Sequence, residues 1–271
     1  MARQTVPVAL TIAGSDSGGG AGIQADLKTF AALGVFGTTA ITCLTAQNPD
    51  AVTRVEPVDP GMVVEQVQTV CAGFPVKAVK TGMLFSRDII RAVARVIRQS
   101  AFRFVVVDPV MVATSGARLL REDAVTALCR DLLPLATVLT PNLPEAELLW
   151  GKAIESETGQ AAAARRIAER FGTACVVKGG HLSGRQVTDL LFLKGRVYRF
   201  EAPRLHAVET HGTGCTFSAA LAALLAKGLK LPAAVQAAQR YVGQCLATSV
   251  RAGSHRPMGW IFRMPFALRQ R

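Results

Sequence analysis

Short apolar runs recur along the chain, separated by longer segments whose apolar residues follow helical spacing. Apolar runs bounded by Gly, Pro or polar residues are typical of buried strands, and apolar residues three or four apart are typical of one helix face. The runs predict strands at residues 6–13, 38–44, 51–55, 78–81, 104–108, 137–140, 175–178, 189–193 and 197–202. The segments between them predict helices at residues 21–33, 60–72, 86–99, 122–132, 144–150, 156–171, 212–227 and 232–250.

The order of these elements predicts an α/β fold. Strands that are so often separated by helices form a mostly parallel sheet covered by helices on both faces. The chain has no internal repeat, low-complexity segment or linker, and its 271 residues suit a single domain spanning residues 1–271. In such sheets, ligands bind beyond the carboxyl ends of the strands.

The composition describes a compact globular protein, with 50% hydrophobic and 18% charged residues. No apolar run reaches the roughly 18 residues of a membrane span, and the first residues lack the pattern of a signal peptide, so we expect a cytoplasmic protein. The cysteines are widely spaced and form no C-x-x-C pair, which predicts reduced thiols without disulfides or a zinc site. They are Cys43, Cys71, Cys129, Cys175, Cys215 and Cys245.

The formal net charge of +12 raises the question of nucleic-acid binding. Lys and Arg are scattered through the predicted helices, with an excess after residue 250, and no aromatic-interleaved platform for RNA is present. We therefore expect no nucleic-acid partner. The charge is expected to solvate helix faces and to attract anionic small molecules.

Polar and glycine-rich segments follow the predicted strands directly. The first strand leads into a loop at residues 14–20, and later strands lead into Asp108, Thr140-Pro141-Asn142 and Lys178-Gly179-Gly180. Because the carboxyl ends of parallel strands share one edge of the sheet, these segments should lie together. The sequence therefore predicts a ligand site at this edge.

The segment His211-Gly212-Thr213-Gly214-Cys215 begins a predicted helix. Free N–H groups and a partial positive charge at a helix start favour phosphate, and a thiol there should have a lowered pKa. Cys215 is thus a candidate thiolate base, with a buried structural cysteine as the alternative. The segment matches neither a P-loop nor the dinucleotide-binding fingerprint, so any phosphate chemistry is of another type.

Seven segments in collinear order, from residue 8 to about 250, resemble the hydroxymethylpyrimidine/phosphomethylpyrimidine kinases of thiamine biosynthesis, in the ribokinase superfamily. They lie at residues 13–26, 45–48, 80–84, 108–111, 140–145, 178–181 and 211–216. The resemblance implies a ribokinase-like, three-layer α/β/α fold. It also implies an ATP-dependent kinase that phosphorylates 4-amino-5-hydroxymethyl-2-methylpyrimidine and then its monophosphate. The chain departs from the family after Gly253, which leaves the packing of its C-terminal segment open.

By this resemblance, Asp26 and Gln47 hydrogen-bond the aminopyrimidine, and their side chains suit a ring that offers an amine beside a nitrogen acceptor. Gly14 lets the backbone approach the ring, and Met83 and Val110 supply apolar walls. The alternatives are structural: a solvated helix carboxylate for Asp26, a loop-capping amide for Gln47, and core packing for Met83 and Val110.

The resemblance also assigns the phosphoryl-transfer groups. Lys178 reaches the ATP phosphates, although a lysine at a strand end is often only solvated. Asn142 and Glu145 organise Mg²⁺ through water, yet Asn-Leu-Pro-Glu also describes a helix start. Asp108 supports the metal or the phosphates. The remaining phosphate contacts come from Thr210, Thr213 and the backbone N–H groups of Gly212, Thr213, Gly214 and Cys215.

Cys215 favours a pyrimidine kinase, because sugar kinases and most pyridoxal kinases of the superfamily carry Asp at this place. A pyridoxine or pyridoxal kinase is the first alternative, since some members with the Cys motif act on that ring. A non-catalytic pyrimidine sensor is the second. The family expectation is a homodimer, and both the completion of the second phosphorylation and the need for a monovalent cation stay open.

Overall fold

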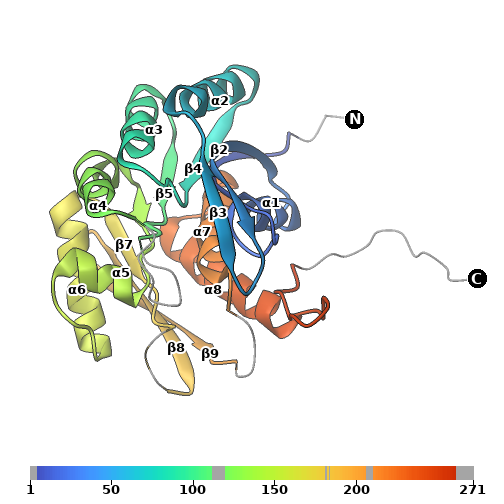
Figure 1. The fold of residues 1–271 in the computed structure, drawn as a ribbon. Coiled ribbons are helices and arrows are strands. Elements are labelled where there is room, and N and C mark those ends of the chain that lie inside the picture. Colours follow the sequence, from blue (N-terminus) through green and yellow to red (C-terminus); the bar gives the residue numbers. More distant parts are fainter. Residues whose placement is uncertain (1–4, 112–119, 181, 183, 206–209, 261–271) are drawn as a thin grey trace, which may run out of the picture.

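The computed structural model describes residues 5–111, 120–180, 182, 184–205 and 210–260. A nine-stranded sheet runs through it in the order β3-β2-β1-β4-β5-β6-β7-β8-β9 (Figure 1). The strands are β1 (Val8–Asp16), β2 (Phe36–Gln47), β3 (Val52–Pro57), β4 (Val76–Thr81), β5 (Phe104–Val107), β6 (Val138–Leu139), β7 (Ala174–Val177), β8 (Gln186–Leu193) and β9 (Arg196–Pro203). All nine predicted strands are present.

The six strands from β2 to β7 in the sheet are parallel to one another, whereas β3 at one edge and β8 and β9 at the other pair antiparallel. The order of the parallel strands reverses beside β1, because β1 lies between β2 and β4. A crevice forms beyond the carboxyl ends of strands at such a reversal, which is where an open α/β sheet binds ligands.

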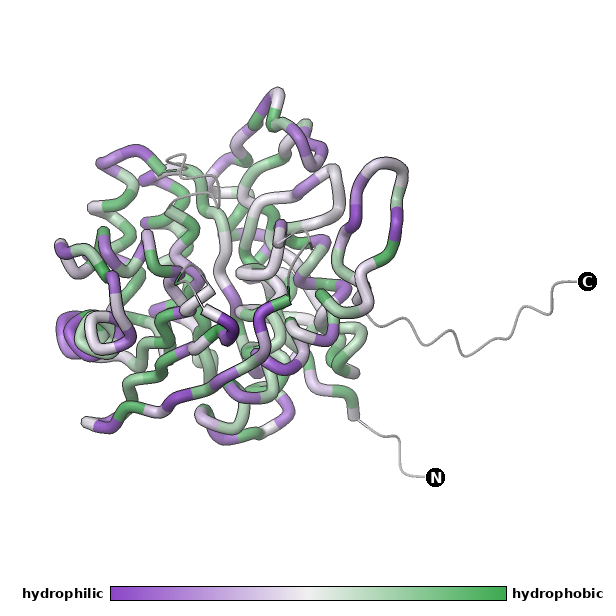
Figure 2. Tube along the Cα trace, turned by 90° about the horizontal axis from the view of Figure 1, so that it is seen from below, coloured by the Kyte–Doolittle hydropathy of each residue, from purple (hydrophilic) through white to green (hydrophobic). Residues whose placement is uncertain are grey.

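Helices cover both faces of the sheet, as the three-layer prediction requires. Residues of α1 (Gly22–Ala32), α7 (Thr213–Ala226) and α8 (Leu231–Ala247) share one core cluster with the sheet. The other face carries α2 (Pro60–Gly73), α3 (Arg87–Gln99), α4 (Glu122–Ala127), α5 (Leu143–Trp150) and α6 (Glu157–Phe171). Hydrophobic segments run through the interior and hydrophilic segments lie toward the outside (Figure 2).

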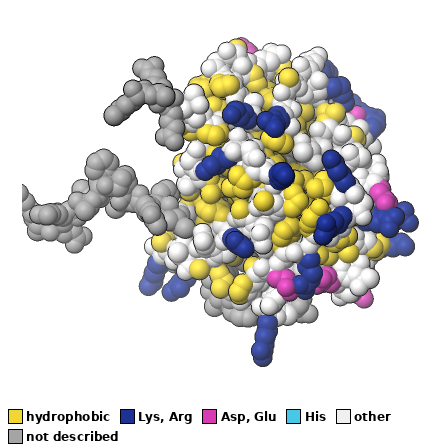
Figure 3. Space-filling model, turned by 180° about the vertical axis from the view of Figure 1, so that it is seen from behind, with side chains coloured by type: hydrophobic (Ala, Val, Ile, Leu, Met, Phe, Trp, Pro, Cys, Tyr) yellow, Lys and Arg dark blue, Asp and Glu magenta, His cyan; other side chains and the backbone are white. Residues whose placement is uncertain are grey.

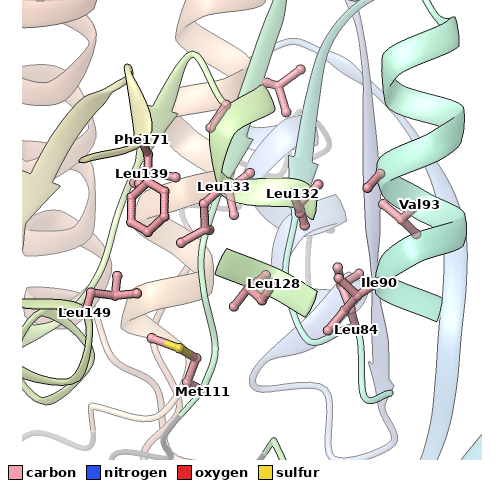
Figure 4. Close-up of a cluster of buried hydrophobic side chains, with 14 of the residues drawn as sticks. Leu84, Ile90, Val93, Met111, Leu128, Leu132, Leu133, Leu139, Leu149 and Phe171 are labelled. Atoms are coloured by element: carbon pink, nitrogen blue, oxygen red, sulfur yellow. The ribbon is translucent and has the colours of Figure 1, made fainter. Parts of the chain in front are cut away.

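The core under α3, α4 and α6 is built from hydrophobic side chains, most of them branched aliphatic. Figure 4 shows ten of them labelled, converging from helices, strands and loops: Leu84, Ile90, Val93, Met111, Leu128, Leu132, Leu133, Leu139, Leu149 and Phe171. Burying one such side chain stabilises a fold by about 1.5–3 kcal/mol. This core fixes the strands whose carboxyl ends carry the polar loops.

The predicted helix at residues 122–132 is not one regular α-helix. It is α4 followed by a π-helical turn at Leu128–Leu132 and a 3₁₀ turn at Leu133–Leu135 that contains Pro134. The wider turn still buries Leu128 and Leu132, so the hydrophobic pattern of a helix is preserved while its hydrogen-bond geometry changes.

The C-terminal segment packs on the α1 side of the molecule up to Trp260. Trp260 is buried, and the Lys28 ammonium lies 4.4 Å from its ring centroid. Thr248 Oγ1 donates to the carbonyl oxygen of Gly259, which ties the end of α8 to this segment. Of the divergent residues, 253–257 are described, whereas 262–265 lie outside the described residues.

Basic side chains are dispersed over the face shown in Figure 3, among hydrophobic and uncharged groups, and they do not merge into a stripe. Within the described part of the chain, no helix is both long enough and apolar enough to cross a membrane.

Candidate active site

A cavity of about 580 Å³ opens at the carboxyl ends of the parallel strands. Its walls come from the loop after β1, the β2–β3 hairpin, the segments after β4, β5, β6 and β7, and the start of α7. The structure therefore brings together the segments that the sequence placed at one edge of the sheet.

Asp16 organises the first glycine-rich loop. Its carboxylate is buried and accepts hydrogen bonds from the backbone N–H groups of Gly18 (2.8 Å), Gly20 (3.1 Å) and Ala21 (2.7 Å). Burial raises the pKa of Asp16, but its hydrogen bonds to His211 and to the N–H groups of Ala21 and Gly18 lower it by more, so the pKa lies below its ordinary value. The loop is thus held by a charged acceptor at the cavity wall.

Four of the five predicted pyrimidine-binding residues line the cavity: Gly14, Gln47, Met83 and Val110. Gln47 Oε1 lies 3.3 Å from the Thr45 hydroxyl, and no described residue accepts a hydrogen bond from its Nε2. A Cβ at Gly14 would lie 2.7 Å from Cys43 Sγ, so packing against β2 also requires a glycine there.

Val110 has φ +46°, in the left-handed region that a β-branched residue rarely adopts. Its backbone is therefore strained beside the cavity. Such strain persists only where the surrounding structure enforces it, and it is frequent at ligand sites.

Asp26 does not reach the cavity surface. It is fully buried, with its Oδ2 2.6 Å from Thr11 Oγ1 and 2.8 Å from Lys80 Nζ. Lys80 is also fully buried, and it lines the cavity whereas Asp26 does not. Asp26 Oδ1 has no hydrogen-bond partner among the described residues. The structure thus gives Asp26 a lysine partner behind the cavity wall and no direct face toward a ligand.

Helix α7 begins at Thr213, after Gly212 in the left-handed conformation (φ +80°), close to the predicted start. A Cβ at Gly212 would clash with the carbonyl oxygen of Gly20, so the two glycine-rich segments are in direct contact. The Thr213 N–H donates to the Thr210 carbonyl oxygen, whereas the N–H groups of Gly214 and Cys215 have no acceptor among the described residues. These two N–H groups are available to an anion.

Cys215 is half-buried in the cavity wall, and its sulfur accepts a hydrogen bond from the Gly22 N–H at the start of α1. The expected lowering of its pKa is wrong for the unliganded protein: burial raises the pKa of the thiol to about 11, although Lys80 and the Gly22 N–H lower it. The helix start can be recognised in the sequence, but the burial of Cys215 and the nearby carboxylates cannot. Burial and the carboxylates raise the pKa by more than the helix start lowers it.

Lys178 follows β7 and its Nζ lies 3.1 Å from Asp108 Oδ1. Burial alone would lower the pKa of Lys178, but the carboxylates of Asp108 and Glu145 raise it. Burial, and then Asp108, raise the pKa of Glu145 to about 7. The three side chains line one end of the cavity and form a compact charged group.

Asn142 and Glu145 also cap α5, as the alternative interpretation of their spacing predicts. The Glu145 N–H donates to Asn142 Oδ1 and the Asn142 N–H donates to Glu145 Oε2, both at 2.9 Å. Glu145 Oε1 accepts a further hydrogen bond from the Met111 N–H. The cap fixes both side chains while they still face the cavity.

These residues fit a magnesium ion that keeps most of its water. No group of three His, Cys, Asp or Glu side chains that could enclose a metal occurs in the described part of the chain. Asp108 and Glu145 nevertheless place two carboxylates at the cavity, and no described residue donates a hydrogen bond to Asp108 Oδ2. Magnesium typically binds one or two carboxylates together with water and substrate phosphates.

Thr210 and Thr213 lie beside the cavity and are not among its lining residues. The Thr213 hydroxyl donates to the Thr210 carbonyl oxygen at 2.9 Å, so the two residues form a local turn before α7. Their predicted contact with phosphate stays a prediction.

Three residues of the motifs line the cavity although the sequence analysis assigned them no role in the site: Asp16, Lys80 and His211. Lys80 carried a usable signal, because a charged residue in the apolar strand β4 requires a buried partner. The partner itself, Asp26, lies 54 residues earlier and follows only from the fold.

Comparisons with known proteins agree with this geometry. The family model described as phosphomethylpyrimidine kinase matches residues 16–259. A hydroxymethylpyrimidine/phosphomethylpyrimidine kinase of Rhizobium meliloti is 52% identical over 245 residues, covering 90% of this chain and 92% of that protein.

Two solved structures are similar along nearly their whole length. A phosphomethylpyrimidine kinase of Clostridium difficile is 38% identical with a TM-score of 0.79, covering 88% of this chain and 98% of the other. An ADP complex of Bacillus subtilis pyridoxal kinase is 38% identical with a TM-score of 0.87, covering 94% and 97%.

Proposed function

The chain belongs to the phosphomethylpyrimidine kinase family, and from this premise we propose how its cavity works. The substrate is 4-amino-5-hydroxymethyl-2-methylpyrimidine, whose hydroxymethyl oxygen receives the γ-phosphoryl group of ATP. The monophosphate then accepts a second phosphoryl group to give the diphosphate. The chain is thus a kinase with two successive acceptors in one cavity.

One observation carries this proposal: Cys215, the free N–H groups of α7, Lys178 and the Asp108–Glu145 carboxylates line the same cavity as Gln47, Met83 and Val110. The first group of residues suits phosphate and the second suits a small polar ring. A cavity that joins the two allows an acceptor hydroxyl to face a phosphoryl donor.

In the proposed reaction, the substrate oxygen bonds to the γ-phosphorus while the bond from that phosphorus to the bridging oxygen of ATP breaks, releasing ADP. The hydroxyl proton passes to Cys215 in its thiolate form, which becomes the neutral thiol. The N–H groups of Gly214 and Cys215, together with the Lys178 ammonium, stabilise negative charge on the transferred group. The second acceptor is already anionic and needs no base.

Asp108, Asn142 and Glu145 are the residues proposed to hold Mg²⁺, chiefly through water. When bound, the ion neutralises phosphate charge during transfer. The Glu145 carboxylate that the α5 cap fixes, together with Asp108 at the same cavity, supports this assignment. A contribution from a monovalent cation stays open.

A product assay tests the function. Hydroxymethylpyrimidine, its monophosphate and pyridoxine are each supplied with Mg-ATP, and kcat/KM is measured for every acceptor. We expect the two pyrimidines to exceed pyridoxine by about tenfold or more, because the site's polar groups are left unpaired by the wrong ring.

Comparable turnover of pyridoxine would overturn the substrate and favour the pyridoxal kinase alternative, whose specific support is the Bacillus subtilis neighbour. Absence of phosphoryl transfer to all three acceptors would overturn the kinase. The homodimer and the cytoplasmic location expected from the sequence stay predictions, and light scattering of the purified chain tests the first.

A further inference from the structure

Lys80 is a buried cation in the wall of the cavity. Its side chain is fully buried on β4, and its Nζ lies 2.8 Å from Asp26 Oδ2. An ammonium group has three N–H donors, and Asp26 is the single acceptor that the described residues provide. Burial alone would lower the pKa of Lys80, but Asp26 raises it well above its usual range. Lys80 therefore stays charged in the folded protein.

Gly82 keeps space open for this cation. A Cβ at Gly82 would lie 2.8 Å from Lys80 Nζ and 3.0 Å from Ala13 Cβ, closer than non-bonded atoms tolerate. Gly82 has no positive φ that would itself demand glycine. The glycine is thus explained by the ammonium group and its neighbour on β1.

Cys215 and Lys80 both line the cavity, and the Lys80 charge acts on the Cys215 sulfur. The Gly22 N–H, at the first residue of α1, donates to the sulfur, and Asp26 follows one turn later in the same helix. Helix α1 thereby supplies both a hydrogen bond to Cys215 and the carboxylate that fixes Lys80. The start of α7 adds its partial positive charge.

We infer that the Lys80–Asp26 pair is a positioning element that holds a cation beside Cys215 and favours the thiolate form of that side chain. The inference deepens the proposed function, because it rests on Cys215 acting as the base of the first phosphorylation. Lys80 acts through the sulfur and needs no contact with the substrate.

The charges around the sulfur come from several elements, and they oppose one another. Asp26 on α1 and Asp108 after β5 disfavour a thiolate, whereas Lys80 on β4 is the strongest influence in its favour. Lys178 after β7 also interacts favourably with a Cys215 thiolate, whereas Glu145 on α5 adds a further carboxylate close to Asp108 and Lys178. Loss of Lys80 leaves burial and the carboxylates without their main opponent.

Alkylation of Cys215 in the unliganded protein tests the inference. The rate with iodoacetamide is followed from pH 8 to 11 by mass spectrometry of the Cys215 peptide, in wild type, Lys80→Met and Lys80→Met/Asp26→Leu. The double variant replaces the buried pair by apolar side chains, which folded proteins commonly tolerate. We expect alkylation at pH 9 to be roughly 3- to 30-fold slower in Lys80→Met. The double variant should be slowed by a smaller factor, because Asp26, which disfavours the thiolate, is removed together with Lys80.

Lys28→Met is the matched control, because Lys28 lies on α1 but contacts the Gly19 carbonyl oxygen and Trp260. Its Cys215 alkylation should match wild type. A folded variant, single or double, whose Cys215 is alkylated at the wild-type rate would overturn the inference. Alkylation requires neither pyrimidine nor ATP, so this outcome is distinct from failure of the proposed kinase activity.

Discussion

The imidazole of His211 lies 3.2 Å from the carboxylate of Asp16, across 195 residues of sequence. Asp16 holds the loop after β1, and His211 directly precedes the Gly212 turn that starts α7. The pair therefore fixes the first glycine-rich loop against the helix start that carries Cys215. This contact thus fixes the position of the loop after β1, which lies beside the ring-binding residues, relative to the start of α7, which is expected to hold phosphate.

Asp16→Ala should lower the free energy of unfolding by about 1–3 kcal/mol, because three backbone N–H groups lose a charged acceptor. Urea unfolding measures this change. His211→Ala is the control: its side chain is 43% exposed and makes one contact with Asp16, so its loss should cost less than about 1 kcal/mol. Equal losses in the two variants would contradict the role given to Asp16.

Cys215→Ala should lower kcat for the first phosphorylation by roughly 10²–10⁴, the usual range for a positioned general base. The second phosphorylation should suffer less, because its acceptor oxygen is already anionic. Substrate binding should change little, since the N–H groups of α7 remain. Cys71→Ala is the control, because Cys71 lies on α2 away from the cavity. Small, equal losses in both steps of a folded Cys215→Ala protein would assign Cys215 to packing.

Gln47→Ala should weaken pyrimidine binding by about 1–3 kcal/mol, because a ring group loses its hydrogen-bond partner. ATP affinity should be unchanged, since Gln47 lies on the β2–β3 side of the cavity and Lys178 on the other. Isothermal titration calorimetry measures both affinities. Gln68→Ala, an exposed change on α2, serves as the control. Unchanged pyrimidine affinity in Gln47→Ala would remove this residue from the site.

Glu145 should make the stability of the metal-free protein fall between about pH 4.5 and 7. Its pKa is raised to about 7 in the folded state and lies near 4.5 in the unfolded chain, so the folded state binds more protons in this range. Rising pH then favours unfolding, by at most about 1.4 kcal/mol per pH unit from this group. Glu145→Gln, which cannot titrate, should show a flatter profile in urea unfolding with chelator present. Identical profiles for the two proteins would show that Glu145 does not titrate here.

The arrangement of strands and helices followed from the sequence because the apolar runs of the central parallel strands are buried on both faces of the sheet. The start of α5 was also accessible, since an Asn, a Pro and a Glu at that spacing satisfy the free N–H groups of a helix end. The π-helical turn after α4 was not, because a hydrophobic pattern fixes which face is buried but not which carbonyl each N–H reaches.

Most of the candidate site could be assembled from motifs at strand ends, but its electrostatics could not. Asp26 was expected at the pyrimidine, and in the structure its carboxylate pairs with Lys80, a partnership set by how α1 packs on β1 beside β4. The pKa of Cys215 was expected to fall because the helix start can be recognised in the sequence. Its burial, and the carboxylates that are distant in sequence but close to it in the fold, cannot be recognised there. The sequence indicates whether a side chain lies at a helix start, but only the fold shows how far that side chain is removed from water.

Gln47 belongs to the β2–β3 hairpin at an antiparallel edge of the sheet, whereas Lys178 and Asp108 follow strands in its middle. The outer strand of an edge hairpin has no further strand beside it. The hairpin can therefore change in length or sequence without disrupting strand pairs on that outer side. Ring specificity can therefore diverge by exchange of this hairpin while the transfer chemistry is inherited intact. Transplanting residues 44–55 from a relative with another vitamin ring would be a direct way to retrace such a divergence.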